Sequence, residues 1–327
     1  RMKLTVYSAT FFTFVACATN VIFLEHLVKF SPGCGELVTF AQFLFIASYG
    51  FVTVAKFGTE PPKVPIREYL FAVVLFYGSS ISGNLAFECH ISMPIQMIFK
   101  SGSVMASMAL GVLLLKRSYS LTKYVSVVMI TIGIGMCLLF STKDKKNESE
   151  PEVNFFTWLW GVFLLTCSLF MGARLGVCQE EISLKYGKYP EESSFYLHAL
   201  ALPGFLFFSK KIYSQASIFT TSEYFELPII QTGVPVIWLY LVVNVATQFV
   251  CIKSVYQLST EMSSLSVTVV LTLRKFLSLL ISIYYFQNPF TIYHWIGSAL
   301  VFTGTLLFTG VLQSVLSFSK DSLKKTN

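Results

Sequence analysis

Basic side chains inside long apolar segments are the most unusual feature of this sequence. Lys100, Arg274 and Lys275 lie in runs long enough to cross a lipid bilayer. A Lys or Arg at the centre of a spanning helix costs about 2.5–3.5 kcal/mol, so it usually faces a cavity or a partner. The only aspartates, Asp144 and Asp321, lie outside the apolar runs. Two embedded lysines with no acid nearby indicate a site for an anion.

Helical periodicity places these cations on polar stripes. At 100° per residue, one face of the segment around Lys275 carries Ser264, Thr268, Thr272, Lys275, Ser278 and Ser282, whereas Arg274 points about 100° away. The segment around Lys100 has a similar stripe, made of Gln96, Lys100, Ser103 and Ser107. Lys100 and Lys275 are therefore expected at corresponding depths, on two sides of one cavity.

Two further segments carry polar stripes. One holds Tyr77, Ser80, Asn84 and Glu88, and the other holds Tyr240, Asn244, Gln248 and Cys251. The alternative role for such side chains is to link helices by hydrogen bonds, which is the favoured interpretation for the hydroxyls. For the two lysines, ligand binding is favoured. Cations among hydroxyls, amides and tyrosines suit a phosphate or pyrophosphate that carries polyhydroxyl groups.

The apolar segments that carry these polar and basic residues are expected to be membrane helices. Hydrophobic residues make up 54% of the 327 positions and charged residues 13%, against about a quarter charged in soluble domains. Ten apolar stretches fit: Tyr7 to Leu27, Leu37 to Ala55, Tyr69 to Cys89, Pro94 to Leu115, Leu121 to Phe140, Phe155 to Cys178, Ser194 to Phe208, Ile229 to Val255, Ser263 to Phe286 and Ile292 to Leu316. We therefore expect an all-α polytopic membrane protein with ten transmembrane helices.

The polar run STKDKKNESEPE, residues 141–152, divides the chain. We expect a first five-helix repeat at 1–141, a polar lumenal linker at 142–154, a second five-helix repeat at 155–318 and a cytosolic tail at 319–327. Residues 119–134 align with residues 290–305 at an offset of 171, matching Gly133 to Gly304. Five spans per repeat is an odd number, so the repeats would be inverted, which is a device of transporters.

The distribution of basic residues predicts the orientation. With ten spans both termini share a side, and placing them in the cytosol puts thirteen Lys and Arg in cytosolic segments and six in the opposite ones. The positive-inside rule therefore favours cytosolic termini.

Several other classes of protein lack support. No basic cluster is interleaved with aromatics in a polar domain, so nucleic acid is not expected as a partner. Neither a GxxxxGK[ST] loop nor a Ser/His/Asp grouping is present, so we expect no enzyme and no cofactor. The seven cysteines form no metal motif or disulfide framework, and Cys17 and Cys251 are expected as small apolar residues. A Cys34–Cys89 bridge is conceivable, but two unpaired thiols are favoured.

The most specific segments are NVIFLE (20–25), PGCGELVTFAQFLFIA (32–47), SMPIQMIFKSGS (92–103), FYLHALALPGF (195–205), TQFVCIK (247–253) and SLSVTVVLTLRKFLSLLISIYYFQNPFT (264–291). Through them nearly the whole chain resembles the nucleotide-sugar transporters of the drug/metabolite transporter superfamily, and in particular the branch that carries UDP-N-acetylglucosamine and UDP-xylose.

The resemblance implies ten spans, inverted halves and alternating-access exchange of a cytosolic UDP-sugar for lumenal UMP. Lys275 in TLRKF matches a ninth-span lysine that relatives use against the phosphate and sugar, and Lys100 falls where relatives carry a fourth-span cation. FYLH matches an FYNN motif that contacts the nucleotide; Phe195 and Tyr196 are kept, whereas Leu197 and His198 replace the asparagines, which argues against guanine. Candidate substrate-binding residues are Lys275, Lys100, Arg274, Tyr196, His198, Phe195, Asn84, Asn244, Gln248, Thr272, Ser103, Asn20 and Gln96.

The end of the chain bears on location. Lys324 and Lys325 resemble a dilysine retrieval signal read by cytosolic coat proteins, which favours the endoplasmic reticulum over the Golgi membrane. Asn147 begins a glycosylation sequon in the segment expected in the lumen. The alternative function is transport of another phosphorylated metabolite or nucleotide by the same fold. The sequence indicates neither the preferred UDP-sugar nor an oligomeric state.

Overall fold

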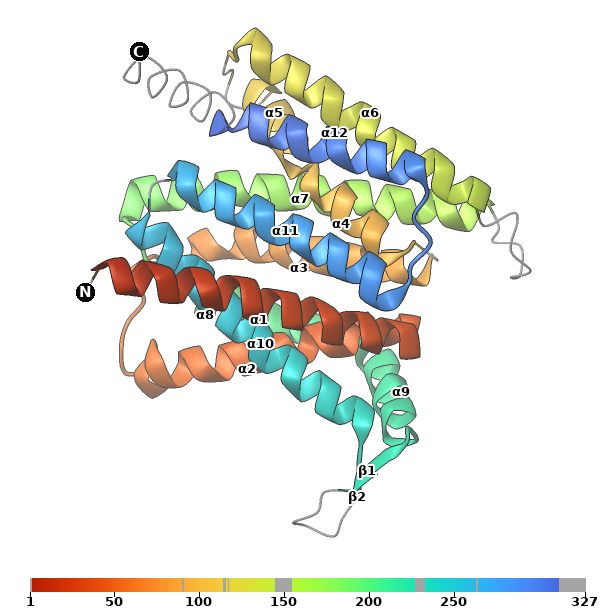
Figure 1. Ribbon diagram of the computed structural model, residues 1–327. Helices are drawn as coiled ribbons and strands as arrows, with labels where there is room; N and C mark the ends of the chain where they lie inside the picture. Colours follow the sequence, from red (N-terminus) through yellow and green to blue (C-terminus); the bar gives the residue numbers. More distant parts are fainter. Residues whose placement is uncertain are drawn as a thin grey trace. The chain divides into compact units, whose positions relative to one another are not determined.

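The structure is a computed structural model that describes residues 2–89, 91–113, 116, 118–144, 155–226, 233–262 and 264–311. These residues are mostly helical, as the sequence predicts, and they also contain one two-stranded antiparallel ribbon (Figure 1). The chain divides into two compact units, which are described separately. His90, the Asn147 sequon and the Lys324–Lys325 pair lie outside the described residues.

Unit 1 comprises residues 1–11, 92–154 and 257–327, and unit 2 comprises residues 12–91 and 155–256. Each unit thus draws elements from both sides of the polar segment at 141–152. The compact units are therefore a different division from the two sequential repeats, whose boundaries stay a prediction.

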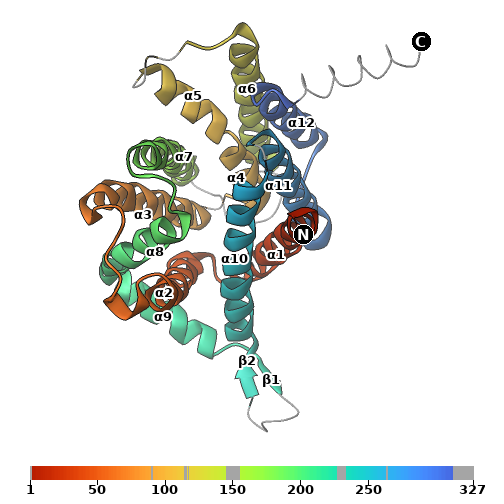
Figure 2. The ribbon, with the colours of Figure 1, turned by 90° about the vertical axis from the view of Figure 1, so that its left-hand side faces the viewer.

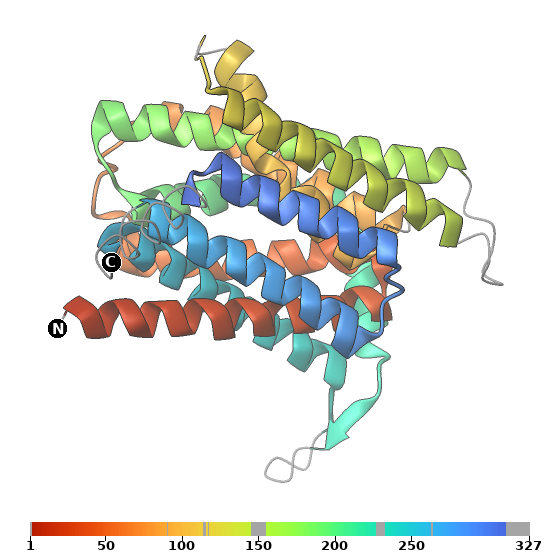
Figure 3. The same ribbon diagram turned by 45° about the horizontal axis from the view of Figure 1, so that its top comes forward.

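Unit 1 is built from α4 (Met93–Ser101), α5 (Ser103–Leu113), α6 (Leu121–Asp144), α11 (Ser264–Phe286) and α12 (Ile292–Phe308). The ribbon of α6 runs beside that of α12 (Figure 3), and α4 packs against α11. Glycines permit the α6–α12 contact: a Cβ on Gly133 would lie 2.5 Å from the Gly297 carbonyl oxygen, and one on Gly297 would lie 2.7 Å from that of Gly133.

Unit 2 is built mainly from α2 (Gly35–Thr53), α3 (Ile66–Glu88), α7 (Phe155–Tyr186), α8 (Pro190–Ala201) and α9 (Ser209–Thr220), with the short 3-10 helices η1 (Pro32–Cys34), η2 (Lys56–Gly58) and η3 (Leu202–Phe208). Helix α3 packs against α7, and α8 packs against α2 and α3. Figure 2 shows the ribbon of β1 (Tyr224–Glu226) and β2 (Gly233–Pro235) between α9 and α10. The sequence does not predict these two strands.

Two helices contribute to both units. Helix α1 (Met2–Phe30) divides after Phe11, and α10 (Val236–Glu261) divides after Tyr256. In unit 1, Ala9 of α1 and Leu258 of α10 share a buried apolar cluster. In unit 2, a second cluster joins the same two helices through Leu27 and Leu241. The two helices therefore pack together on each side of the division.

Two of the expected spans are broken rather than continuous. Gly102 separates α4 from α5, and a Cβ there would lie 2.6 Å from Ile134 of α6, so close packing requires glycine. The expected segment Ser194 to Phe208 comprises most of α8 followed by η3, where Pro203 lies near the start of the 3-10 turn. Proline and glycine are the residues at which membrane helices are commonly interrupted.

Eight helical segments are long and apolar enough to cross a membrane: 6–30, 32–53, 66–88, 93–113, 121–140, 155–186, 236–258 and 269–286. Helix α12 is a shorter apolar helix of 17 residues. The chain is therefore a polytopic, mostly helical membrane protein, as expected. Ten crossings and inverted repeats remain predictions.

Candidate functional site

The basic residues that the sequence singles out lie together in unit 1. Lys100 is in the last turn of α4, directly before the break at Gly102, and Lys275 is near the middle of α11. The Lys275 ammonium interacts electrostatically with both Arg274 and Lys100, because α4 and α11 pack together. Two helices far apart in the sequence thus bring three cations into one region.

No carboxylate pairs with Lys100 or Lys275 among the residues that the structure describes. Lys100 is exposed, whereas Lys275 and Arg274 are half-buried. Like charges repel and partial burial strengthens the repulsion, so an anion between these side chains would lower the electrostatic energy. This arrangement is suited to binding a phosphate or pyrophosphate.

The remaining unit 1 candidates border these cations along their helices. Thr272 on α11 and Gln96 on α4 are both buried, at 7% and 1% exposure. Ser103 begins α5 and is half-buried. Ser264 and Thr268 have no described side chains, so the predicted α11 stripe is represented by Thr272, Ser278 and Ser282, which are all buried, and the half-buried Lys275.

The FYLH residues lie on α8 in unit 2 and are packed against aromatic groups. Phe195 fills the space over Gly50, where a Cβ would lie 2.6 Å from its ring. Tyr196 stacks on Tyr69 with ring centroids 5.3 Å apart. The absence of a Cβ at Gly50 therefore allows α8 to approach α2 closely.

His198 is also held within the aromatic core of unit 2. Its ring packs edge-on to Phe43 at 4.8 Å and to Phe76 at 5.0 Å. Its Nδ1 atom lies 2.6 Å from the Ser194 carbonyl oxygen, one turn earlier in α8. Burial and this contact give His198 a packing role in the structure, and a ligand contact stays a prediction.

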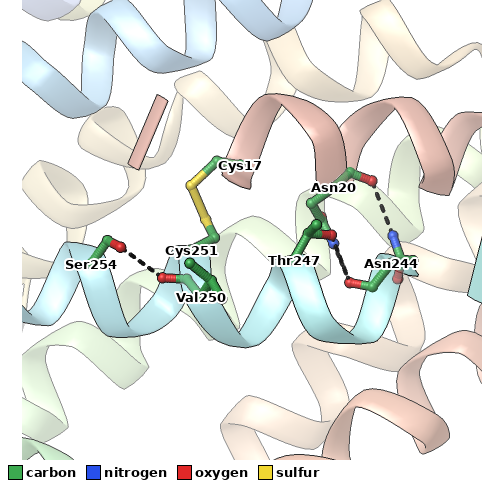
Figure 4. The surroundings of a disulfide bond; sticks show 7 residues. All are labelled: Cys17, Asn20, Asn244, Thr247, Val250, Cys251 and Ser254. Carbon is green, nitrogen blue, oxygen red and sulfur yellow. Dashed lines mark hydrogen bonds between the residues drawn. A yellow bond between two sulfur atoms is a disulfide. The ribbon is translucent and has the colours of Figure 1, made fainter. Parts of the chain in front are cut away.

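The candidate asparagines join helices. Asn20 of α1 and Asn244 of α10 each donate a hydrogen bond to the other's backbone oxygen, at 2.9 and 3.0 Å (Figure 4). Gln42 of α2 donates to the Asn244 side chain at 2.7 Å. Asn84 of α3 donates to the Gly35 backbone oxygen and to Thr39 at 3.0 and 2.7 Å. These contacts fit the helix-linking alternative.

Gln248 lies one turn beyond Asn244 on α10 and is half-buried. Gln248 is thus a candidate in unit 2 that lies next to the Asn20–Asn244 pair along α10 and remains partly exposed.

The expectation that Cys17 and Cys251 are unpaired is wrong. They form a disulfide between α1 and α10, with Cα atoms 5.0 Å apart and 234 residues of separation (Figure 4). Sequence spacing does not predict the bridge because it depends on the pairing of two distant helices. Cys34 and Cys89 are both free thiols, which confirms the favoured expectation for that pair.

Sequence reasoning missed an ionic cluster in unit 2. Lys211 of α9 donates a hydrogen bond to Glu36 of α2 at 2.8 Å and also to Glu88 at the end of α3. Burial lowers the pKa of Lys211, but the hydrogen bonds to the two carboxylates outweigh this effect and raise it above its ordinary value. The cluster fastens α9 to α2 and α3. Its residues are far apart in sequence, so no spacing pattern reveals it.

Glu192 of α8 forms a second missed contact. Its carboxylate accepts hydrogen bonds from the backbone N–H groups of Lys63 and Val64 at 3.0 Å and from Tyr69 at 3.2 Å. It thereby holds the segment that leads into α3.

A helical membrane protein that gathers basic side chains from two packed spans has the features of a transporter of anionic solutes. Comparison with known proteins identifies the family: residues 5–312 match the UAA transporter family, and the chain belongs to it. This confirms the resemblance drawn from the sequence motifs, and the chain is a member of a family of transporters rather than of enzymes.

Two relatives match over almost their whole length. The "UDP-xylose and UDP-N-acetylglucosamine transporter" of Danio rerio is 48% identical, covering 95% of each chain. The "Endoplasmic reticulum GDP-fucose transporter" of Drosophila melanogaster is 46% identical, covering 97% of this chain and 94% of its own. A solved structure with 13% identity covers 92% of this chain and 95% of that one with a TM-score of 0.50, so it shares the fold.

Proposed function

We propose that the protein is a nucleotide-sugar antiporter that moves UDP-N-acetylglucosamine, UDP-xylose or both from the cytosol into the lumen of the endoplasmic reticulum or Golgi, in exchange for UMP. The observation that carries this proposal is the electrostatic interaction of Lys275 with Lys100 and with Arg274, with no carboxylate partner for the two lysines in the described part of the chain. The diphosphate of a UDP-sugar and the phosphate of UMP supply the complementary charge.

The relatives support the substrate class. The zebrafish protein that is 48% identical is named as a transporter of UDP-xylose and UDP-N-acetylglucosamine. The uridine nucleotide and phosphate are common to both UDP-sugars, and UMP shares the uridine and its phosphate, so one set of cations serves the entering and the leaving molecule. The similar charge of the two ligands makes their exchange nearly electroneutral.

Alternating access between two inverted repeats is the proposed mechanism, and the pairing of helices supports it. Counting crossings along the chain, α2 is the second and α8 belongs to the seventh, α4 belongs to the fourth and α11 is the ninth, and α6 is the fifth and α12 the tenth. Each of these three pairs packs together. A two-fold relation between five-helix halves maps each contact between elements five crossings apart onto itself, so these contacts are consistent with it.

Two further helix pairs agree with the same relation. Helix α3 packs against α7, which pairs the third and sixth crossings, and α1 is bridged to α10, which pairs the first and eighth. Adding five crossings to each member converts one pair into the other. The corresponding positions Gly133 and Gly304 also both lie at the α6–α12 contact, where a Cβ on Gly304 would lie 2.8 Å from Ile130.

The second candidate function is transport of another nucleotide or phosphorylated metabolite by the same fold. It is favoured by the Drosophila relative named for GDP-fucose, which is nearly as similar as the zebrafish protein. The anion site does not distinguish these cargoes, because the UDP-sugars and GDP-fucose all carry a diphosphate. Selectivity between UDP-sugars and GDP-fucose must therefore come from contacts to the base or the sugar.

We place the protein in the endoplasmic reticulum or Golgi membrane with both termini in the cytosol. The Drosophila relative is named for the endoplasmic reticulum. A cytosolic C-terminus would present Lys324 and Lys325 to coat proteins, and these residues lie outside the described part of the chain.

The experiment that tests this function is counterflow with the purified protein in liposomes. Vesicles loaded with UMP or with GMP are given labelled UDP-N-acetylglucosamine, UDP-xylose or GDP-fucose, and vesicles loaded with buffer alone serve as the control. We expect uptake of one or both UDP-sugars that depends on internal UMP. Uptake of GDP-fucose against internal GMP alone would favour the second candidate, and no uptake of any UDP-sugar by folded protein would refute the proposal.

A further inference from the structure

Gln96 is a buried amide whose hydrogen-bonding groups are not used. The residue is 1% exposed, and among the residues that the structure describes neither its amide nitrogen nor its amide oxygen has a hydrogen-bond partner. Its neighbours on α4 are the buried apolar residues Ile95, Ile98 and Phe99. Burying a polar group without a partner destabilises the folded protein, and most buried polar groups in native structures are satisfied.

The position of Gln96 relates it to the anion site. It precedes Lys100 by four residues in α4, so both side chains lie on the same face of the helix, one turn apart. An apolar residue of similar length would fit among Ile95, Ile98 and Phe99 without an unsatisfied amide. A ligand held by Lys100 would instead supply polar atoms one helical turn away.

We propose that Gln96 is a specificity-determining residue, whose amide pairs with an adjacent N–H donor and C=O acceptor on the uncharged part of the substrate. The inference rests on the proposed function and extends it from the phosphates to the group that is recognised beside them. A primary amide offers one acceptor and two donors, so it satisfies both partners of such a group at once.

Two parts of the expected substrates can pair with a primary amide. The imide edge of uracil presents N–H beside C=O on one side, so both can pair with Gln96 at once. The acetamido group of N-acetylglucosamine is a trans amide whose N–H and C=O point in opposite directions, so it offers Gln96 one of them at a time. UMP and UDP-xylose carry only the first, N-acetylglucosamine 1-phosphate carries only the second, and UDP-N-acetylglucosamine carries both. These four compounds therefore distinguish the two sources.

Because Gln96 has almost no exposed surface here, the contact forms when the polar face of α4 is uncovered. Alternating access supplies such a conformation, since the bound ligand must be reached from each side in turn. The ligand-free closed state then carries the unsatisfied amide, and the bound state satisfies it.

The test is the variant Gln96→Met, which keeps an unbranched side chain of similar volume and removes the amide. Gln179→Met on α7 is the matched control, since Gln179 is a half-buried glutamine outside the anion site. Two quantities are measured in detergent: the melting temperature of the ligand-free protein, and the dissociation constants of the four compounds and of pyrophosphate.

We expect Gln96→Met to raise the ligand-free melting temperature, because it removes an unsatisfied buried amide, and to weaken amide-bearing ligands about 10- to 100-fold. Pyrophosphate binding stays unchanged. Weakening of UMP, UDP-xylose and UDP-N-acetylglucosamine assigns the contact to uracil, whereas weakening of only the two N-acetylglucosamine compounds assigns it to the acetamido group.

Unchanged dissociation constants for all four compounds would overturn the inference, and so would an equal loss that includes pyrophosphate. Gln96→Leu repeats the measurement if the methionine variant does not fold. The proposed function fails separately, because wild-type protein that binds none of the uridine compounds refutes it without any variant.

Discussion

At the scale of single residues, replacing Lys275 by alanine should weaken ligand binding without lowering the stability of the ligand-free protein. We expect Lys275→Ala to lower the counterflow rate about 100-fold, since it removes a charge-assisted contact worth about 1.5–3 kcal/mol. The ligand-free protein should keep or gain thermal stability, because Lys275 interacts with two other cations. The measurement is the initial counterflow rate per reconstituted protein, together with the melting temperature.

Lys123→Ala is the control for this prediction. Lys123 lies on α6, where its ammonium contacts the rings of Tyr119 and Phe308 rather than the other cations. The Lys123→Ala protein should therefore transport at the wild-type rate. A Lys275→Ala protein that exchanges as fast as wild type would remove Lys275 from the site.

The sequence predicts which cations bind the ligand but not what surrounds them in the fold. Lys100 and Lys275 stand out because a charge in an apolar run is costly, and this argument needs no neighbours. Asn20 and Asn244 stand out for the same reason, yet their hydrogen bonds to each other become visible only when α1 and α10 are paired. A polar residue within an apolar span can thus be recognised in the sequence, whereas its hydrogen-bond partner is identified only in the structure.

At the scale of elements, the apolar runs predicted most helices, because length and hydropathy suffice to define a span. The breaks were not predicted. Gly102 lies between α4 and α5, and a Cβ there would lie 2.6 Å from the Ile134 side chain of α6, a contact that belongs to the packing and not to the local sequence. The same reason explains why the disulfide and the Lys211 cluster were missed.

The disulfide between α1 and α10 gives a prediction at this scale. Alkylation of the denatured, unreduced protein should leave Cys17 and Cys251 unmodified and label Cys34, Cys89, Cys137, Cys167 and Cys178, as peptide mass spectrometry would report. Replacing both bridge cysteines by serine should lower the melting temperature, since a bridge that closes a long loop typically contributes about 2–4 kcal/mol.

The control for the bridge is Cys137→Ser together with Cys167→Ser, which changes two free thiols. Labelling of Cys17 and Cys251 before any reductant is added would contradict the bridge.

At the scale of the whole molecule, the contacts α2–α8, α4–α11 and α6–α12 support the proposed two-fold relation between the halves of the chain more strongly than the sequence alignment does. The residue alignment at an offset of 171 rests on a few matches, including Gly133 with Gly304. Helix packing preserves a two-fold relation after side chains diverge, because each contact needs only complementary shape. The polar segment that separates the halves lies largely outside the described residues, so its predicted lumenal position rests on charge alone.

Orientation in the membrane is the last property that can be predicted for the whole chain. Thirteen basic residues against six favour cytosolic termini, because positively charged loops are retained on the cytosolic side. Ten crossings require that both ends behave alike. In cells whose plasma membrane alone is permeabilised, antibodies should therefore reach epitope tags at both the N- and the C-terminus, while a tag placed within residues 142–154 should become accessible only after detergent. Accessibility of one terminus alone would imply an odd number of crossings and exclude two five-helix halves, whereas lumenal exposure of both termini would reverse the charge argument but leave the helix count intact.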